Sequence, residues 1–170
     1  MRYSFEFVTD PPDLPAFQAL MQEFFETMLA KLVAVGGPQL SAPELAAGTV
    51  ANLDAMRPPK GRLLLATRDD GRLIGCGVLR QIRPDAAELK RMYIRPEARG
   101  HGLGRQLFER RIEEARRMGC KTLYADTIKG NTAMLSMYER FGFTYMPRYP
   151  ENANGPELAP YLVYLEHHLV

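Results

Sequence analysis

The 170 residues of the chain suit one domain, because a single hydrophobic core commonly serves roughly 100 to 200 residues. The 46% hydrophobic and 25% charged residues are average for globular proteins, which argues against disordered, fibrous and membrane classes. A net charge of only +2 gives no field that would favour nucleic acid as a partner. No apolar run could span a bilayer, and residues 1–15 lack an export pattern. We expect one cytoplasmic domain over residues 1–170, with no membrane and no nucleic-acid partner.

The N-terminal part predicts a strand followed by two helices. A short strand is expected over residues 3–9. Apolar residues at steps of three and four then predict an amphipathic helix over residues 14–32. Ser41 with Glu44 three positions later is typical of a capping box, so a second helix should begin there and run to about residue 53.

The middle of the chain predicts a hairpin and a third strand. Strand-like runs over residues 62–68 and 73–82 are joined by a turn containing Gly71, which supplies the positive φ of a tight hairpin. A third run covers residues 87–94.

The C-terminal half predicts alternating helices and strands. A helix is expected over residues 103–118, closed by Gly119. The remainder predicts a strand over 122–126, a helix from Asn131, and strands over 143–146 and 161–166. Hairpins first and a strand-helix-strand unit later predict a mixed sheet with helices on its faces, an α/β or α+β sandwich.

The two cysteines carry no chemistry in this interpretation. Cys76 and Cys120 are far apart and lack a C-x-x-C spacing, so neither a disulfide framework nor a zinc site is indicated. We expect both to be small buried apolar residues, and we expect no metal site.

Basic residues gather between positions 90 and 117. Those in residues 110–117 alternate with glutamates at helical-neighbour spacing, which favours a solvated helix face. Arg99 and Arg105 remain as the pair that could face an anionic cofactor.

Three glycines mark the junction between the third strand and the following helix. Gly100, Gly102 and Gly104 stand where the first helical N–H groups have no intrahelical partner and point outward at the positive end of the helix dipole. This favours a diphosphate cradle, although an ordinary flexible turn stays an alternative. The loop is neither a dinucleotide fingerprint nor a P-loop, since no acidic ribose binder or Gly-Lys-Ser/Thr follows.

Two further patterns lie near the loop. Leu89 and Met92 are apolar but three residues apart, which a β-bulge would place on one face; the alternative is that they face opposite buried sides. Asn131 and Tyr138 are seven residues apart on a predicted helix, so both should lie on the same face.

Together these features closely resemble the GCN5-related N-acetyltransferase (GNAT) superfamily over the C-terminal half of the chain. The matching elements are Arg99-x-x-Gly102-x-Gly104 after Ile94-x-Pro96, then Asn131, Tyr138 and Phe141-Gly142-Phe143. The N-terminal half matches only in the order of its elements.

The resemblance implies an acyl-CoA N-acyltransferase-like fold, with a mixed central sheet splayed near the middle and helices on both faces. It also implies acetyl-CoA as cosubstrate, with the pantetheine along residues 92–94, the diphosphate at residues 99–105, and Asn131 against the cofactor arm. The cofactor-binding set is Met92, Tyr93, Ile94, Arg99, Gly100, His101, Gly102, Leu103, Gly104, Arg105, Asn131 and Tyr138.

The chemistry that the resemblance implies is direct attack of a primary amine on the thioester in a ternary complex. Tyr138 would protonate the leaving sulfur, and a backbone N–H near Met92 or Ile94 would polarise the carbonyl. Glu88 would act as the base through water, or it would merely pair with Lys90 or Arg91 at the surface. We expect His101 to face solvent or phosphate.

The acceptor is a small molecule or a peptide in this interpretation. Residues 145–152 could bound its pocket, with Arg148 suited to a carboxylate, or they could be a rigid connection. Two other functional hypotheses stay open. One is a catalytically inactive CoA-binding regulatory module, and the other is a homodimer that uses the terminal strands.

Overall fold

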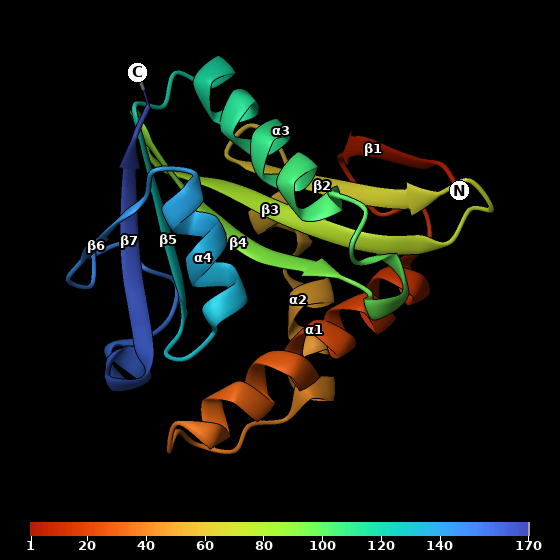
Figure 1. Ribbon diagram of the computed structural model, residues 1–170. Coiled ribbons are helices and arrows are strands. Elements are labelled where there is room, and N and C mark those ends of the chain that lie inside the picture. Colours follow the sequence, from red (N-terminus) through yellow and green to blue (C-terminus); the bar gives the residue numbers. More distant parts are fainter. Residues whose placement is uncertain (170) are drawn as a thin grey trace.

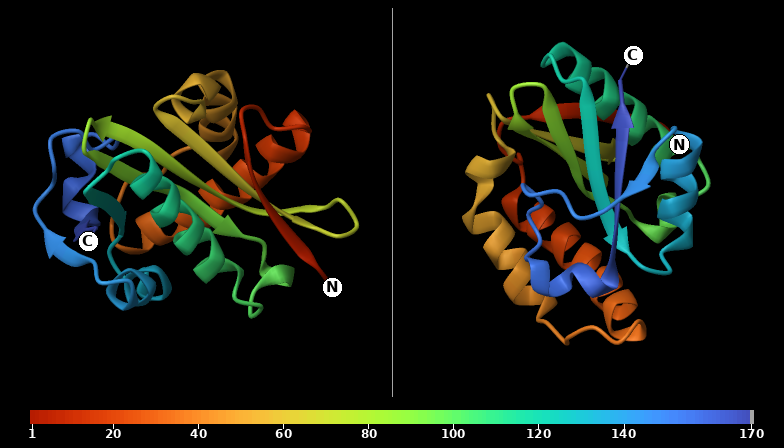
Figure 2. Two further views of the ribbon diagram at one scale, coloured as in Figure 1. Left: turned by 90° about the horizontal axis from the view of Figure 1, so that it is seen from above. Right: turned by 90° about the vertical axis from the view of Figure 1, so that its left-hand side faces the viewer.

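The computed structural model describes residues 1–169 and contains a seven-stranded sheet in the order β1-β2-β3-β4-β5-β7-β6. Helices cover both faces of the sheet, with α1 and α2 on one side and α3 and α4 on the other (Figures 1 and 2). The strands are β1 (Tyr3–Val8), β2 (Gly61–Arg68), β3 (Leu73–Arg83), β4 (Ala86–Ile94), β5 (Thr122–Ile128), β6 (Thr144–Met146) and β7 (Leu162–His168). The helices are α1 (Leu14–Ala34), α2 (Ala42–Ala51), α3 (Leu103–Arg117) and α4 (Thr132–Arg140), with 3₁₀ turns η1 (Leu53–Met56), η2 (Pro96–Ala98) and η3 (Pro156–Tyr161). The predicted fold class is confirmed.

The local signals in the N-terminal half act as the sequence predicts. The hydroxyl of Ser41 accepts a hydrogen bond from the backbone N–H of Glu44 at 3.3 Å, so the second helix starts where it was expected. The β2–β3 hairpin turns at Gly71, whose φ is +87°. The second helix ends at Ala51, and η1 takes up the chain after it.

The sheet divides in its middle. β4 and β5 are parallel, and they pair only over Ala86–Leu89 and Thr122–Ala125. Beyond that point β4 continues to Ile94 beside β3, whereas β5 continues to Ile128 beside β7. The two strands therefore diverge, as Figure 1 shows, and open the sheet between the two helical layers.

Each face of the sheet has its own apolar core. On the α3 and α4 face, the ring of Phe108 packs edge-on against Tyr138, with centroids 5.2 Å apart, and against Phe143. On the α1 and α2 face, Phe17 and Met21 are fully buried against the sheet. Burying each such side chain contributes roughly 1.5–3 kcal/mol to folding stability, so apolar packing holds each helical layer against its own face of the sheet.

A β-bulge interrupts β4 at the point where the strands diverge. Cys76 pairs with Tyr93 and Val78 with Lys90, so β4 has one residue more than β3 across this step. Arg91 within the bulge has a φ of +50°, which is rare for a residue other than glycine.

The bulge places Leu89 and Met92 on one face. Both side chains pack into the apolar core beneath α3 and α4. The predicted bulge is confirmed, and the alternative that these two residues face opposite sides is wrong.

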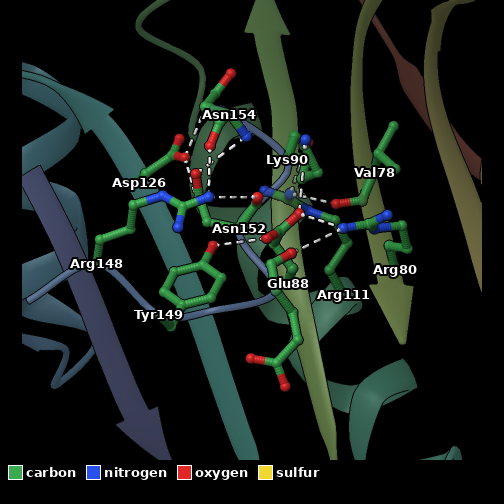
Figure 3. Close-up of polar contacts among 11 residues, drawn as sticks. Val78, Arg80, Glu88, Lys90, Arg111, Asp126, Arg148, Tyr149, Asn152 and Asn154 are labelled. Atoms are coloured by element: carbon green, nitrogen blue, oxygen red, sulfur yellow. Dashed lines mark hydrogen bonds and ion pairs between the residues drawn. The ribbon is translucent and has the colours of Figure 1, made fainter. Parts of the chain in front are cut away.

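Arg111 corrects the expectation of a solvated face over residues 110–117. Its side chain is only 1% exposed, and its guanidinium donates to the carbonyl oxygens of Val78 and Leu107 at 3.1 Å (Figure 3). Burial lowers the pKa of Arg111 to about 10. Gly77 provides the room, since a Cβ there would lie 2.7 Å from Arg111 Nε. A buried cation thus satisfies carbonyl groups beside the bulge, which the charge pattern along α3 could not predict.

Both cysteines are buried, as predicted. Cys76 is fully enclosed and its thiol donates to the carbonyl oxygen of Arg91 at 3.3 Å. Burial raises the pKa of the Cys76 thiol to about 12, so it stays protonated. Across residues 1–169, no helix has the length and apolar character required to traverse a bilayer.

Candidate active site

A cavity of about 230 Å³ lies where β4 and β5 diverge. Its lining comes from both layers of the molecule, because α1 and α2 provide apolar side chains while α4 provides Asn131, Met134 and Tyr138. β4 and β5 contribute polar groups between these walls. We call this space the central cavity. It is the place where a ligand on one side of the sheet can meet a ligand on the other.

Helix α4 presents two predicted site residues to the central cavity. Asn131 is the N-cap residue of α4, and its side-chain N–H donates to Thr127 Oγ1 at 2.9 Å. Tyr138 lies two turns later and is 4% exposed. Burial raises the pKa of Tyr138, so the phenol remains protonated at neutral pH. The prediction that both residues share one face is confirmed.

The glycine loop leads into α3 with unpaired amides. Gly102 is the N-cap of α3 with a φ of +73°, and no side chain caps this end. The first helical bond runs from the Gln106 N–H to the Gly102 carbonyl at 3.2 Å. The N–H groups of Leu103, Gly104 and Arg105 precede that bond, and none has an intrahelical partner.

Gly104 brings this loop close to the rest of the site. A Cβ at Gly104 would lie 3.1 Å from Met137 Cε and 3.2 Å from Met92 Cε. The start of α3 therefore approaches both α4 and the bulged part of β4. A side chain at this position would require both methionine methyl groups to move, so the glycine leaves space beside the amides.

The charged side chains of the loop lie outside the central cavity. Arg99 Nε donates to the Ile94 carbonyl at 2.9 Å, and Arg105 Nε donates to Glu109 Oε1 at 2.6 Å. His101 is exposed, with its ring 5.8 Å from that of Tyr3. The position of His101 agrees with the expectation that it faces outward and argues against a role as a base.

Glu88 is buried beside the central cavity and does not line it. Tyr149 donates its hydroxyl proton to Glu88 Oε2 at 2.7 Å, and Arg80 Nη2 lies 3.3 Å from Oε1 (Figure 3). Lys90 Nζ lies 3.5 Å from the same Oε1. The alternative expected an ion pair between Glu88 and Lys90 at the surface. The pair exists, but Glu88 is buried, so its location at the surface is wrong. Lys90 lines the central cavity and so connects it to Glu88 through their ion pair.

The sequence reasoning missed two charged groups that line the central cavity, Arg91 and Asp126. Asp126 Oδ2 accepts hydrogen bonds from the side-chain amides of Asn152 at 2.6 Å and Asn154 at 2.8 Å (Figure 3). Arg91 Nη1 donates to Thr49 Oγ1 at 2.6 Å. Asp126 lies on β5 just beyond the residues that pair with β4, a placement that only the structure shows. No pattern in the sequence marks the α2 partner of Arg91.

Arg148 has a different role from carboxylate binding. Its Nη2 donates to the carbonyl oxygens of Asn152 at 3.2 Å and Asn154 at 2.9 Å, and it does not line the central cavity. Arg148 therefore stabilises the turn that carries the two asparagines, which favours the interpretation of residues 145–152 as a connection.

The comparisons with known proteins agree with this geometry. The model of the Acetyltransferase (GNAT) family matches residues 17–143. An uncharacterized N-acetyltransferase of Schizosaccharomyces pombe is 28% identical over 143 residues, covering 84% of this chain and 83% of the relative. An acetyltransferase structure from Streptococcus agalactiae has a TM-score of 0.76 at 19% identity, covering 98% of both chains. The PaiA N-acetyltransferase of Thermoplasma acidophilum, solved with coenzyme A, has a TM-score of 0.69 at 17% identity and covers 98% of this chain and 99% of that one.

The chain belongs to the acetyltransferase (GNAT) family. The resemblance found in the glycine loop and in α4 is thereby confirmed, and the protein is an N-acetyltransferase whose cosubstrate is acetyl-CoA.

Proposed function

We propose that the protein transfers an acetyl group from acetyl-CoA to a primary amine by direct attack in a ternary complex. The observation that carries this proposal is the central cavity, which is lined by α4 on one face of the sheet and by α1 and α2 on the other. Two ligands that enter from opposite faces can meet there without an acyl-enzyme. The cavity of about 230 Å³ is smaller than the roughly 300–1,000 Å³ of drug-sized sites, which favours a small molecule over a peptide as acceptor.

The residues around the loop fit the cosubstrate. The amides of Leu103, Gly104 and Arg105 suit the diphosphate, because they lack helical partners and stand at the positive end of α3. Arg99 and Arg105 lie at the same end and would balance the phosphate charge. When bound, acetyl-CoA supplies a thioester with an electrophilic carbonyl carbon and a thiolate leaving group.

The rest of the cofactor set would hold the arm. β4 pairs with β5 only as far as Leu89, so the edge of β4 that faces β5 is open at Met92, Tyr93 and Ile94, and its main-chain groups are suited to hydrogen-bond an extended arm. The Asn131 amide would reach the same arm from α4. A main-chain N–H near Met92 or Ile94 would donate to the developing oxyanion.

Tyr138 would serve as the general acid. Its raised pKa keeps the phenol protonated at neutral pH, so a proton is available for the sulfur as the carbon–sulfur bond breaks. The ring packs against Phe108 and Phe143, so the hydroxyl group is held in one position before the substrates bind.

Glu88 would receive the proton of the acceptor ammonium, relayed through water. Both of its oxygens already have partners, and Glu88 itself does not line the central cavity. Asp126 is a competing acceptor of that proton, since it lines the cavity directly. Replacing each carboxylate separately distinguishes the two.

The proposal is tested by acetyl-CoA binding together with release of the coenzyme A thiol over a panel of amines. At 100 times its dissociation constant acetyl-CoA should stabilise the fold by about 2.7 kcal/mol, a rise in melting temperature of about 5 to 10 °C. ATP and NAD should give no such rise. Absence of any shift with acetyl-CoA would refute the proposed cofactor site. Tight binding without thiol release over the whole panel would favour the inactive module instead.

A further inference from the structure

The central cavity contains one cation and one anion that lack a charged partner. Among residues 1–169, the ion pairs of the structure include Lys90 with Glu88 but none that involves Arg91 or Asp126. Both groups line the same cavity without pairing with each other. A partly buried charge without an ion-pair partner loses part of its hydration, which suggests that a ligand provides the missing charge.

The contacts of the Arg91 side chain fix its position but bring no negative charge to it. Its Nη1 donates to Thr49 Oγ1 at 2.6 Å, and its guanidinium carbon lies 5.3 Å from the centre of the Phe25 ring. The Thr49 contact uses one donor of five, so most of the planar fork remains available. Burial is the largest cause that lowers the pKa of Arg91, and the negative charge of Glu88 offsets it only in part.

The backbone at Arg91 points to the same conclusion. Its φ of +50° is unfavourable for a residue with a Cβ and persists only where the surroundings enforce it. The bulge at this position aims the side chain toward α1 and α2, away from the core beneath α3 and α4. A glycine or asparagine would fit this backbone better, so the strain suggests a demand for the guanidinium itself.

The cosubstrate does not supply the anion that Arg91 lacks. The amides suited to phosphate lie at the start of α3, and neither Arg99 nor Arg105 lines the central cavity. The part of acetyl-CoA that would reach the cavity is the neutral thioester end. The missing negative charge therefore belongs to the acceptor.

The wall that α1 and α2 contribute to the cavity is apolar. Phe24, Phe25 and Met28 of α1 line it together with Leu45 of α2. Such a wall suits a hydrocarbon side chain, because burying apolar surface contributes roughly 25 cal/mol per Å².

From these observations we infer that the acceptor is a small amino acid with an apolar side chain, whose carboxylate binds Arg91 and whose ammonium group binds Asp126. This inference rests on the proposed function and specifies its substrate class. Arg91 forms charge-assisted, two-pronged hydrogen bonds with the carboxylate, which a neutral amide cannot accept equally well. Asp126, held by Asn152 and Asn154, orients the nitrogen toward the cavity centre.

The test compares leucine with leucinamide, which differ only in the carboxylate, by titration calorimetry on protein saturated with coenzyme A. The pH is chosen so that both amines are protonated. We expect the wild-type protein to bind leucine at least about 10-fold more tightly than leucinamide. Equal binding, tighter binding of leucinamide, or no leucine binding would overturn the inference without reference to any variant.

The decisive variant is Arg91→Gln, which keeps a donor for Thr49 but removes the charge. Leucine affinity should fall about 10- to 100-fold, leucinamide affinity should stay unchanged, and Arg91→Lys should recover part of the loss. Arg117→Gln removes an exposed arginine on α3 and should alter neither affinity. Equal weakening of both ligands by Arg91→Gln would show a structural role and overturn the inference.

Two further readouts separate the outcomes. The melting temperature of Arg91→Gln should match or exceed that of the wild-type protein, because an uncompensated cation is removed. Thiol release from acetyl-CoA is then followed with leucine, leucinamide and 3-methylbutylamine. Leucine binding that requires Arg91, without thiol release, would sustain the inference and contradict the proposed function. Preferred acetylation of 3-methylbutylamine or leucinamide would sustain the function and overturn the inference.

Discussion

The two sides of the central cavity differ in the chemical groups that they offer to a ligand. On the α3 and α4 side, the groups suited to a ligand are mostly main-chain amides, glycines and two residues of one short helix. On the α1 and α2 side they are charged side chains drawn from β4 and β5 and fixed by contacts with α2 and the turn at residues 152–154. Main-chain groups vary little when side chains change, whereas one substitution can alter a charge. The first side is therefore suited to a constant cosubstrate and the second to a selected acceptor.

Tyr138→Phe should give the largest effect, and it acts on the α4 side alone. Loss of the phenolic proton should lower kcat by about 10²- to 10⁴-fold, because a general acid contributes about that much. The affinity for acetyl-CoA should stay nearly constant, since the ring still packs against Phe108 and Phe143. Single-turnover kinetics and cofactor titration measure the two effects. An unchanged kcat would remove Tyr138 from the mechanism.

Arg111→Met should give the largest effect on stability, and it acts beside the β4 bulge rather than in the cavity itself. Removing the guanidinium leaves the carbonyl groups of Val78 and Leu107 without its hydrogen bonds in the interior. The free energy of unfolding should fall by about 3 kcal/mol, as expected when buried polar groups lose their partners. Arg116→Met, at an exposed position of the same helix, is the matched control and should change it by less than about 0.5 kcal/mol. Equal stability of both variants in urea would contradict the role assigned to Arg111.

Glu88→Gln and Asp126→Asn test which carboxylate takes the acceptor proton. The one that acts as base should, when replaced, lower kcat/KM by about 10²-fold and abolish the acidic limb of its pH profile. The other should leave the shape of the profile unchanged. Glu88→Gln retains an oxygen for the Tyr149 hydroxyl, so its fold should persist and the comparison remains interpretable. A profile that keeps its acidic limb in Glu88→Gln would exclude Glu88 as the base.

The same division explains what the sequence could predict. Elements in chain order, the hairpin, the bulge and the pair formed by Asn131 and Tyr138 depend on local spacing, and all were confirmed. The placement of β7 between β5 and β6 was not predicted. Arg111 was placed in solvent because its helical neighbours are charged, although the space beside Gly77 buries it. The assignments of individual site residues to acetyl-CoA and to catalysis remain predictions.

The charges of the acceptor side were beyond reach for a physical reason. Arg91 is 42 positions from Thr49, and Asp126 is 26 positions from Asn152. Periodicity describes neighbours within one element, so it carries no information on such pairs. The buried state of Glu88 likewise depends on Tyr149, which follows it by 61 positions.

Gly102→Ala should give the smallest effect and separates backbone strain from ligand contact. Gly102 and Gly119 flank α3 with φ values of +73° and +84°, and a Cβ added at either position would meet no atom within 4 Å. Alanine at either end should therefore destabilise the fold similarly, by about 1 kcal/mol. Only the Gly102 variant should also weaken acetyl-CoA binding, by about 10-fold, because its Cβ stands beside the free amides of α3. Equal cofactor affinity in the two variants would mean that the diphosphate lies elsewhere. The assignment of the α3 and α4 side of the cavity to acetyl-CoA would then be wrong.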